Sequence, residues 1–185
     1  LVIDAAYAEY MRANDYEAGV ELAGSAGNVL MTRTFSKIHG LAALRVGWAY
    51  GPADIIDALN RVRGPFNVAA PAQAAAVAAI TDLAFPEQSA AHNASELARF
   101  ESAMADFGFA FTKSVANFCL VHLDADGPYT ADACDRFLRG RGIIARRVNA
   151  YGLPNAIRVS IGATAENDAV IAAFADFRAA GGRSA

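Results

Sequence analysis

Cysteine and histidine are scarce in this 185-residue sequence. The two cysteines, Cys119 and Cys134, are too few for a disulfide framework and too far apart for a CxxC pair or a zinc site. We therefore expect both to be small buried apolar side chains in a protein of the reducing cytoplasm. The three histidines show no metal-ligand spacing, so we expect no metal site.

An excess of one charge sign and a long apolar run are also absent. The chain has 16 basic and 19 acidic residues and a net charge of −3, so we expect no nucleic-acid partner and no membrane partner. No stretch approaches the roughly 20 apolar residues that a membrane span needs. Disorder is excluded, because 55% of the residues are apolar. The composition predicts a globular protein.

Apolar β-rich runs alternate with alanine-rich helical windows, which predicts an α/β fold. We expect strands at 1–3, 29–32, 46–50, 117–123, 143–148 and 157–161, and helices at 53–62, 71–83, 90–107, 131–138 and from an N-cap at Thr164 onward. The pattern changes at Phe85-Pro86, so we expect one domain over 1–84 and a second over 85–185. Because a buried strand with no initiator Met opens the sequence, we also expect a piece of a longer chain.

The segment 34–47, Thr-Phe-Ser-Lys-Ile-His-Gly-Leu-Ala-Ala-Leu-Arg-Val-Gly, carries the most specific chemistry. Lys37 follows the hydroxyl of Ser36 and precedes Arg45 by eight residues, which places an amine nucleophile beside two phosphate-binding groups. Pyridoxal phosphate needs this set, because its aldehyde condenses with an amine while a hydroxyl and a bidentate guanidinium bind its phosphate. Taken singly, these residues are more often ordinary surface side chains.

The same segment resembles the cofactor-lysine signature of fold-type I aminotransferases, a Ser-Lys followed by Gly-Leu-Ala and Arg-x-Gly. The resemblance implies part of a large-domain sheet followed by a small α+β domain, with Lys37 holding pyridoxal 5'-phosphate. It also implies that Asp4 faces the pyridine nitrogen and Tyr7 the phenolic oxygen of the cofactor. A carboxylate there would keep the ring nitrogen protonated. Ala5 departs from the commoner Asp-Glu-Ala-Tyr spelling.

Two arginines near the end of the chain are candidates for substrate binding. Arg158 lies inside a β-branched strand, where a cation is costly unless it meets an anion. By resemblance it would bind the substrate's α-carboxylate, and the run from Gly152 to Gly162 is similar to the histidinol-phosphate aminotransferase subfamily. That subfamily would place Arg146 near the substrate's phosphate. Arg147 points to the opposite face of the strand, so we expect one of these two neighbours to be simply solvated.

The resemblance implies a homodimeric transaminase that uses an amino donor, histidinol phosphate, and a 2-oxo acid, 2-oxoglutarate, with Lys37 transferring the proton. It also implies a missing first half that supplies further cofactor contacts, an exposed face where its strands would pair, and little activity for this segment alone. Three alternatives stay open. They are a decarboxylase that acts on a phosphorylated amino acid such as threonine phosphate, an aminotransferase-like regulatory domain, and a non-catalytic structural lobe.

Overall fold

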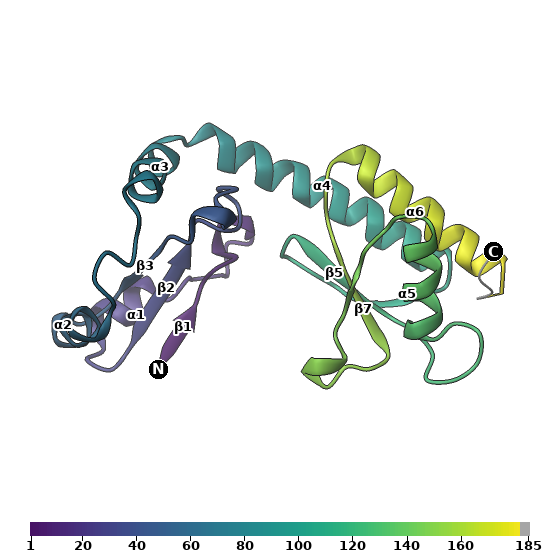
Figure 1. Ribbon diagram of the computed structural model, residues 1–185, viewed down its shortest axis with the longest axis horizontal. Coiled ribbons are helices and arrows are strands. Elements are labelled where there is room, and N and C mark those ends of the chain that lie inside the picture. The colour runs from purple at the N-terminus through teal and green to yellow at the C-terminus, as the bar shows by residue number, and fades with distance from the viewer. Residues whose placement is uncertain (182–185) are drawn as a thin grey trace. The chain divides into compact units, whose positions relative to one another are not determined.

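The computed structural model describes residues 1–181, and the chain divides into two compact units (Figure 1). The first unit runs from Leu1 to Ala90 and the second begins at Ala91. The division falls inside helix α4 (Ala84–Asp106), a few residues after the boundary predicted at Phe85-Pro86. Assigning the two units to a large and a small domain stays a prediction.

The first unit is built on a three-stranded sheet in the order β1-β2-β3, formed by β1 (Val2–Asp4), β2 (Leu30–Thr34) and β3 (Gly47–Tyr50). β1 is parallel to β2 and β3 is antiparallel to it, so all three predicted strands are confirmed. The expected burial of the first strand is wrong for the described residues, because β1 is an edge strand and Val2 is 64% exposed.

Gly47 shows why the loop after the lysine segment ends in glycine. It lies opposite Thr34 at the start of β3, and a Cβ atom added there would approach the carbonyl oxygen of Arg33 to 2.6 Å. Any larger residue would push β3 away from β2. The Arg-x-Gly motif therefore needs glycine at this position so that β3 can pack closely against β2.

The helices of the first unit differ in how much of their surface is covered. They are α1 (Val20–Ser25), α2 (Ala53–Val62) and α3 (Ala70–Thr81), with short 3-10 turns η1 (Ala8–Tyr10) and η2 (Ala42–Leu44). α1, which the pattern did not predict, packs Ala23 in one buried cluster with Met31. α3 packs Ala72 against Phe35. Five apolar side chains on α2, on α3 or just after α3 are exposed: Leu59, Val62, Val77, Ile80 and Leu83.

The start of α4 corrects the sequence prediction, which placed it near residue 90. The helix begins at Ala84, because the Asp82 carboxylate accepts hydrogen bonds from the backbone N–H groups of Ala84 and Phe85, both at 3.1 Å. Pro86 lies in the first turn, where a missing N–H costs nothing. The proline that indicated a boundary is therefore compatible with the helix. The predicted end is confirmed, since Gly108 takes a φ of +75° just after it.

The second unit is a four-stranded antiparallel sheet covered by helices on one face. Its strand order is β4-β5-β7-β6, with β4 (Ala110–Thr112), β5 (Phe118–His122), β6 (Arg146–Arg147) and β7 (Ala156–Ser160). The helices are α4, α5 (Ala131–Gly140) and α6 (Thr164–Ala179), and a 3-10 turn, η3, spans Asn149–Tyr151. β4 was not predicted. One core joins Phe100 of α4, Phe137 of α5, Phe174 of α6, and Val121 and Ile157 of the sheet.

Both cysteines lie in this core and are fully buried, which confirms that expectation. Burial raises the pKa of each thiol to about 12, so neither ionises near neutral pH. Among residues 1–181, no group of three or more His, Cys, Asp or Glu side chains is arranged to hold a metal ion. Within the same residues no helix has the length and apolar character required to cross a membrane.

Two predicted boundaries in the second unit are wrong. The strand expected over 143–148 is reduced to Arg146–Arg147, because the preceding residues close α5: the backbone N–H of Ile143 donates to Leu138, and Gly142 takes a φ of +75°. Thr164 is the first residue of α6 rather than its N-cap. The cap is Ala163, whose backbone N–H donates to the Glu166 carboxylate at 2.8 Å.

Candidate active site

Lys37 lies in a turn directly after β2. The Thr34 hydroxyl, at the end of that strand, accepts a hydrogen bond from the backbone N–H of Ser36 at 3.0 Å, and Gly40 closes the turn by donating to the Lys37 carbonyl at 2.9 Å. The half-buried Lys37 places its Nζ atom 5.1 Å from the centre of the Tyr7 ring. Among residues 1–181 it forms no ion pair with a carboxylate, so its amine is held by packing beside an aromatic ring.

Ser36 and Arg45 converge although nine positions separate them. A guanidinium nitrogen of Arg45 donates to the Ser36 hydroxyl oxygen at 3.2 Å and to the Ala42 carbonyl at 2.8 Å. Arg45 has a φ of 54°, an uncommon backbone conformation for a residue with a side chain. The result is a hydroxyl and a guanidinium side by side next to Lys37, which is the donor set that binds a phosphate group.

Asp4 and Tyr7 lie at the same edge of the sheet. β1 is parallel to β2, so Asp4 at the end of β1 and the turn that follows β2 meet at the carboxyl edge, where such sheets present ligand-binding groups. The exposed Asp4 carboxylate accepts from the backbone N–H of Ala6 at 3.1 Å. The Tyr7 ring lies 6.3 Å from that of Tyr10, whose pKa is raised chiefly by burial and further by Tyr7 and Glu9.

The first unit thus brings together an amine, an aromatic ring, a carboxylate and two hydrogen-bond donors suited to a phosphate group. Such a set can hold a phosphorylated aldehyde, with the amine as its covalent partner. The His39 ring is tilted against that of Phe35, with 5.0 Å between the ring centres, and its Nδ1 atom is buried without a hydrogen-bond partner. His39 is near Lys37 because it is two residues away in the sequence, and this proximity alone implies no catalytic role.

In the second unit, Arg146 and Arg158 are direct cross-strand partners. The register of β6 and β7 pairs their Cα atoms, and both line a pocket of about 500 Å³. Like charges in this arrangement destabilise a sheet, unless an anion lies between them. Neither has a carboxylate partner among residues 1–181, whereas the neighbouring Arg147 forms an ion pair with Asp132. Of the two adjacent arginines, Arg146 is therefore the one available to a ligand.

Arg158 is itself held by an aromatic neighbour. Its guanidinium carbon lies 4.8 Å from the centre of the Phe118 ring, and its Nε atom is buried without a hydrogen-bond partner. Phe118 is the first residue of β5 and pairs with Ser160 of β7, two positions after Arg158. The side chains of Phe118 and Arg158 therefore lie on the same face of the sheet, the one that the helices leave uncovered. Phe118 could be only weakly indicated from the sequence, because an aromatic residue in a strand is usually core.

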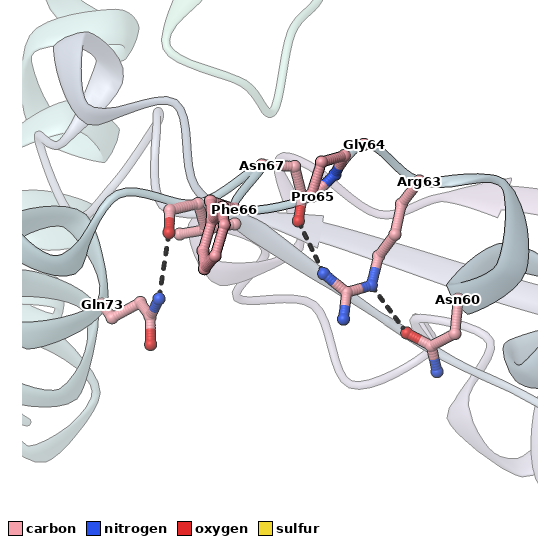
Figure 2. A pocket seen from close by; sticks show the side chains of 8 residues that line it. Asn60, Arg63, Gly64, Pro65, Phe66, Asn67 and Gln73 are labelled. Atoms are coloured by element: carbon pink, nitrogen blue, oxygen red, sulfur yellow. Dashed lines mark hydrogen bonds between the residues drawn. The ribbon is translucent and has the colours of Figure 1, made fainter.

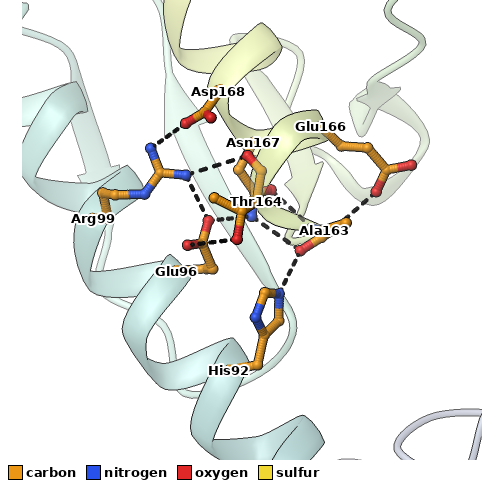
Figure 3. Close-up of polar contacts among 9 residues, drawn as sticks. His92, Glu96, Arg99, Ala163, Thr164, Glu166, Asn167 and Asp168 are labelled. Carbon is orange, nitrogen blue, oxygen red and sulfur yellow. Dashed lines mark hydrogen bonds and ion pairs between the residues drawn. The ribbon is translucent and has the colours of Figure 1, made fainter.

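A hydrogen-bond network fixes the turn that follows β7 (Figure 3). The Asn167 side chain bonds both the N–H of Gly162 at 2.9 Å and its carbonyl at 3.0 Å, and also donates to Glu96 at 2.7 Å. His92 Nε2 donates to the same Gly162 carbonyl at 2.9 Å. Arg99 bridges Glu96 and Asp168, each at 2.6 Å. α4 is thereby tied to the start of α6 and to the end of the strand that carries Arg158.

A further hollow of about 710 Å³ lies between α2 and α3 in the first unit (Figure 2). Arg63 donates to Asn60 and to Asn67, each at 2.9 Å, and Gln73 donates to the Val68 carbonyl at 2.9 Å. Phe66 is 96% exposed and has a φ of 53°. These polar groups hold the loop in place and gather no set of catalytic side chains.

Comparison with solved structures agrees with this architecture. The chain is similar to a histidinol-phosphate aminotransferase from Sinorhizobium meliloti in complex with pyridoxal-5'-phosphate, with a TM-score of 0.87 at 30% identity over 97% of this chain and 49% of that one. A histidinol-phosphate aminotransferase from Clostridium acetobutylicum shares the fold, with a TM-score of 0.87 at 21% identity over 97% of this chain and 54% of that one. The fold is that of the fold-type I aminotransferases, as the lysine segment predicted.

The sequence matches the model of aminotransferase class I and II over residues 1–174, and the chain belongs to that family. A histidinol-phosphate aminotransferase from Rhodopseudomonas palustris strain BisB18 is 51% identical over 179 residues, which are 97% of this chain and 49% of that protein. The corresponding protein of strain BisA53 is 50% identical over the same shares. The chain thus spans about half the length of the curated relatives it matches.

Proposed function

We propose that the protein containing this chain is a pyridoxal-phosphate-dependent aminotransferase and that Lys37 binds the cofactor. The observation that carries the proposal is the turn after β2, where the Lys37 amine lies beside Ser36 and Arg45, two donors joined at 3.2 Å. The Sinorhizobium meliloti relative, solved with pyridoxal-5'-phosphate, supports the cofactor. When bound, the cofactor's ring accepts the electron pair released from the substrate α-carbon.

Each candidate site residue of the first unit has a proposed role that its position supports. Ser36 and Arg45 bind the phosphate, and Asp4 keeps the pyridine nitrogen protonated. Tyr7 bonds the phenolic oxygen. The Lys37 amine would take the proton from the substrate α-carbon and pass it on to the cofactor, because a general base must lie within reach of the atom it deprotonates.

For the substrates we propose histidinol phosphate as amino donor and 2-oxoglutarate as acceptor. The names of the Rhodopseudomonas relatives, at 51% and 50% identity, support histidinol phosphate as the donor. Arg158 would bind the α-carboxylate or its surrogate and Arg146 the phosphate end, since both line one pocket without carboxylate partners among the described residues. We further propose a cytoplasmic homodimer, with the segment 1–84 in the large domain and 85–185 in the small domain. Light scattering of the full-length protein tests the dimer, and a monomer mass would contradict it.

The deciding experiment uses the two lysines of this chain, Lys37 and Lys113. The full open reading frame containing this segment is expressed as wild type, Lys37→Ala and Lys113→Ala, loaded with pyridoxal phosphate and reduced with borohydride. We expect a visible absorption band in the wild type and in Lys113→Ala, and none in Lys37→Ala. Peptide mapping should find the reduced cofactor on Lys37. No band in the wild type, or a label that persists in Lys37→Ala, would refute the proposal.

A further inference from the structure

We propose that Glu9 and Arg33 form a positioning pair for the cofactor site, acting through Tyr7. The inference rests on the proposed function, and it concerns residues that the sequence pattern did not single out. A guanidinium nitrogen of Arg33 donates to the Glu9 carboxylate at 2.7 Å. Glu9 lies in η1, two residues after Tyr7, and Arg33 lies in β2, four residues before Lys37.

The pair is unusual for its burial. The Arg33 and Glu9 side chains are 18% and 22% exposed, and no other ion pair between residues 1 and 181 has both members less than a quarter exposed. Because water screens this pair less, its geometry is more sharply defined than that of a surface pair. Removing one partner would leave the other charge poorly solvated.

The surroundings of Arg33 fix its direction further. Its guanidinium carbon lies 5.8 Å from the centre of the ring of Trp48, its cross-strand partner in β3. Its Nε atom is buried without a hydrogen-bond partner, so Glu9 is the carboxylate that compensates this cation among the described residues. The guanidinium is therefore held between an aromatic ring and one carboxylate.

This geometry connects the two segments whose side chains meet at the site. Tyr7 belongs to the segment after β1 and Lys37 to the segment after β2, and they lie 5.1 Å apart from Nζ atom to ring centre. Asp4 pairs with Thr32 in the β1–β2 ladder, which ends there. Beyond the ladder, the Glu9–Arg33 contact joins η1 to β2. It thereby sets where the Tyr7 ring lies relative to the lysine.

The test compares Glu9→Gln, which keeps the shape and removes the charge, with Asp57→Asn, which breaks the exposed Asp57–Arg61 pair of α2. Both are made in the full-length protein, with Tyr7→Phe and the Tyr7→Phe/Glu9→Gln double variant. The readouts are the pyridoxal phosphate dissociation constant and the pH midpoint of the Lys37-dependent visible band. We expect Glu9→Gln to weaken cofactor binding about three- to tenfold and to shift the midpoint, and Asp57→Asn to change neither.

Non-additivity separates positioning from general stability. If Glu9 acts through Tyr7, Glu9→Gln adds little to the effect of Tyr7→Phe. The inference is overturned if Glu9→Gln lowers Tm but leaves the dissociation constant and the midpoint unchanged, or if the two effects add. Arg33→Lys is the second variant: it should give a smaller change in the same direction, and no change would count against the pair. A missing band in the wild type would refute the proposed function itself, a result distinct from an unchanged Glu9→Gln.

Discussion

Arg45 combines a constrained backbone with a proposed role in binding the cofactor phosphate. Its φ of 54° is costly for a residue with a Cβ atom, and such conformations persist where the surroundings enforce them. Here the guanidinium donates to the Ala42 carbonyl at 2.8 Å, so the side chain stabilises the turn from which it projects. The same nitrogen also reaches the Ser36 hydroxyl. The guanidinium is therefore held beside the Ser36 hydroxyl, where the proposed phosphate site lies.

This arrangement predicts the effect of replacing Arg45. Arg45→Gln removes the cation and the charge-assisted hydrogen bonds to the phosphate, which are worth about 1.5–3 kcal/mol. We expect pyridoxal phosphate to bind about 10- to 100-fold more weakly, as measured by absorbance titration of the apo protein. Arg61→Gln, an exposed arginine of α2, serves as the control and should bind like the wild type. Equal affinities for Arg45→Gln and the wild type would exclude Arg45 from the phosphate site.

At the scale of elements, α4 and α6 owe their relative placement to Glu96. Its carboxylate accepts from Arg99 at 2.6 Å, from Asn167 at 2.7 Å and from Thr164 at 3.3 Å. These hydrogen bonds, with Arg99 contributing most, lower the pKa of Glu96 below its ordinary value of 4.5. Because the pKa is lower in the folded than in the unfolded protein, the stabilisation is complete above 4.5 and is lost as the pH falls through the folded-state value.

Glu96→Gln should therefore change how stability depends on pH. The wild-type Tm should fall as the pH drops below about 4.5. The variant cannot ionise, so it should have a lower Tm at neutral pH and a flatter curve in the acid range. Thermal unfolding of the full-length apo protein, followed by circular dichroism, measures both, with exposed Asp126→Asn as a control that should retain the wild-type curve. Parallel curves for Glu96→Gln and the wild type would contradict this account.

Elements that form from a clear local pattern were predictable, and those decided by capping or by tertiary contacts were not. The apolar run before Thr34 and the alternation around Arg158 identified β2 and β7, and the motif located Lys37, Ser36 and Arg45 near one another. The short α1 and β4 carry too few residues to show a period. The pairing of Glu9 with Arg33 spans 24 positions, and nothing local indicates it.

Boundaries were missed where side chains or turns compete with the pattern. Asp82 starts α4 upstream of Pro86, and the closing turn of α5 takes residues that read as a strand. We expected one of Arg146 and Arg147 to be simply solvated, and the sequence could not show which one, because only the contact of Arg147 with Asp132 distinguishes them. Registers and ion pairs of this kind are tertiary information.

At the scale of the whole molecule, the chain spans about half the length of the relatives it matches. In the proposed enzyme, its two arginine-bearing strands would therefore supply one part of the substrate site. If Arg158 binds the α-carboxylate of 2-oxoglutarate and its surrogate in histidinol phosphate, and Arg146 binds the phosphate end, the two arginines should discriminate between substrates in different ways. 2-Oxoglutarate carries carboxylates but no phosphate. Arg158 would contact both substrates, whereas Arg146 would matter most for the phosphorylated one.

Steady-state kinetics of the full-length enzyme test this division. Arg146→Gln should raise KM for histidinol phosphate about 10-fold or more and leave KM for 2-oxoglutarate within about twofold, because only the phosphate loses a charge-assisted contact. Arg158→Gln should raise both KM values. Arg141→Gln, whose guanidinium lies 3.7 Å from the Phe137 ring, is the matched control and should change neither. Equal increases for both substrates in Arg146→Gln would mean that the residue shapes the pocket without recognising the phosphate, and the proposed donor would lose its structural support.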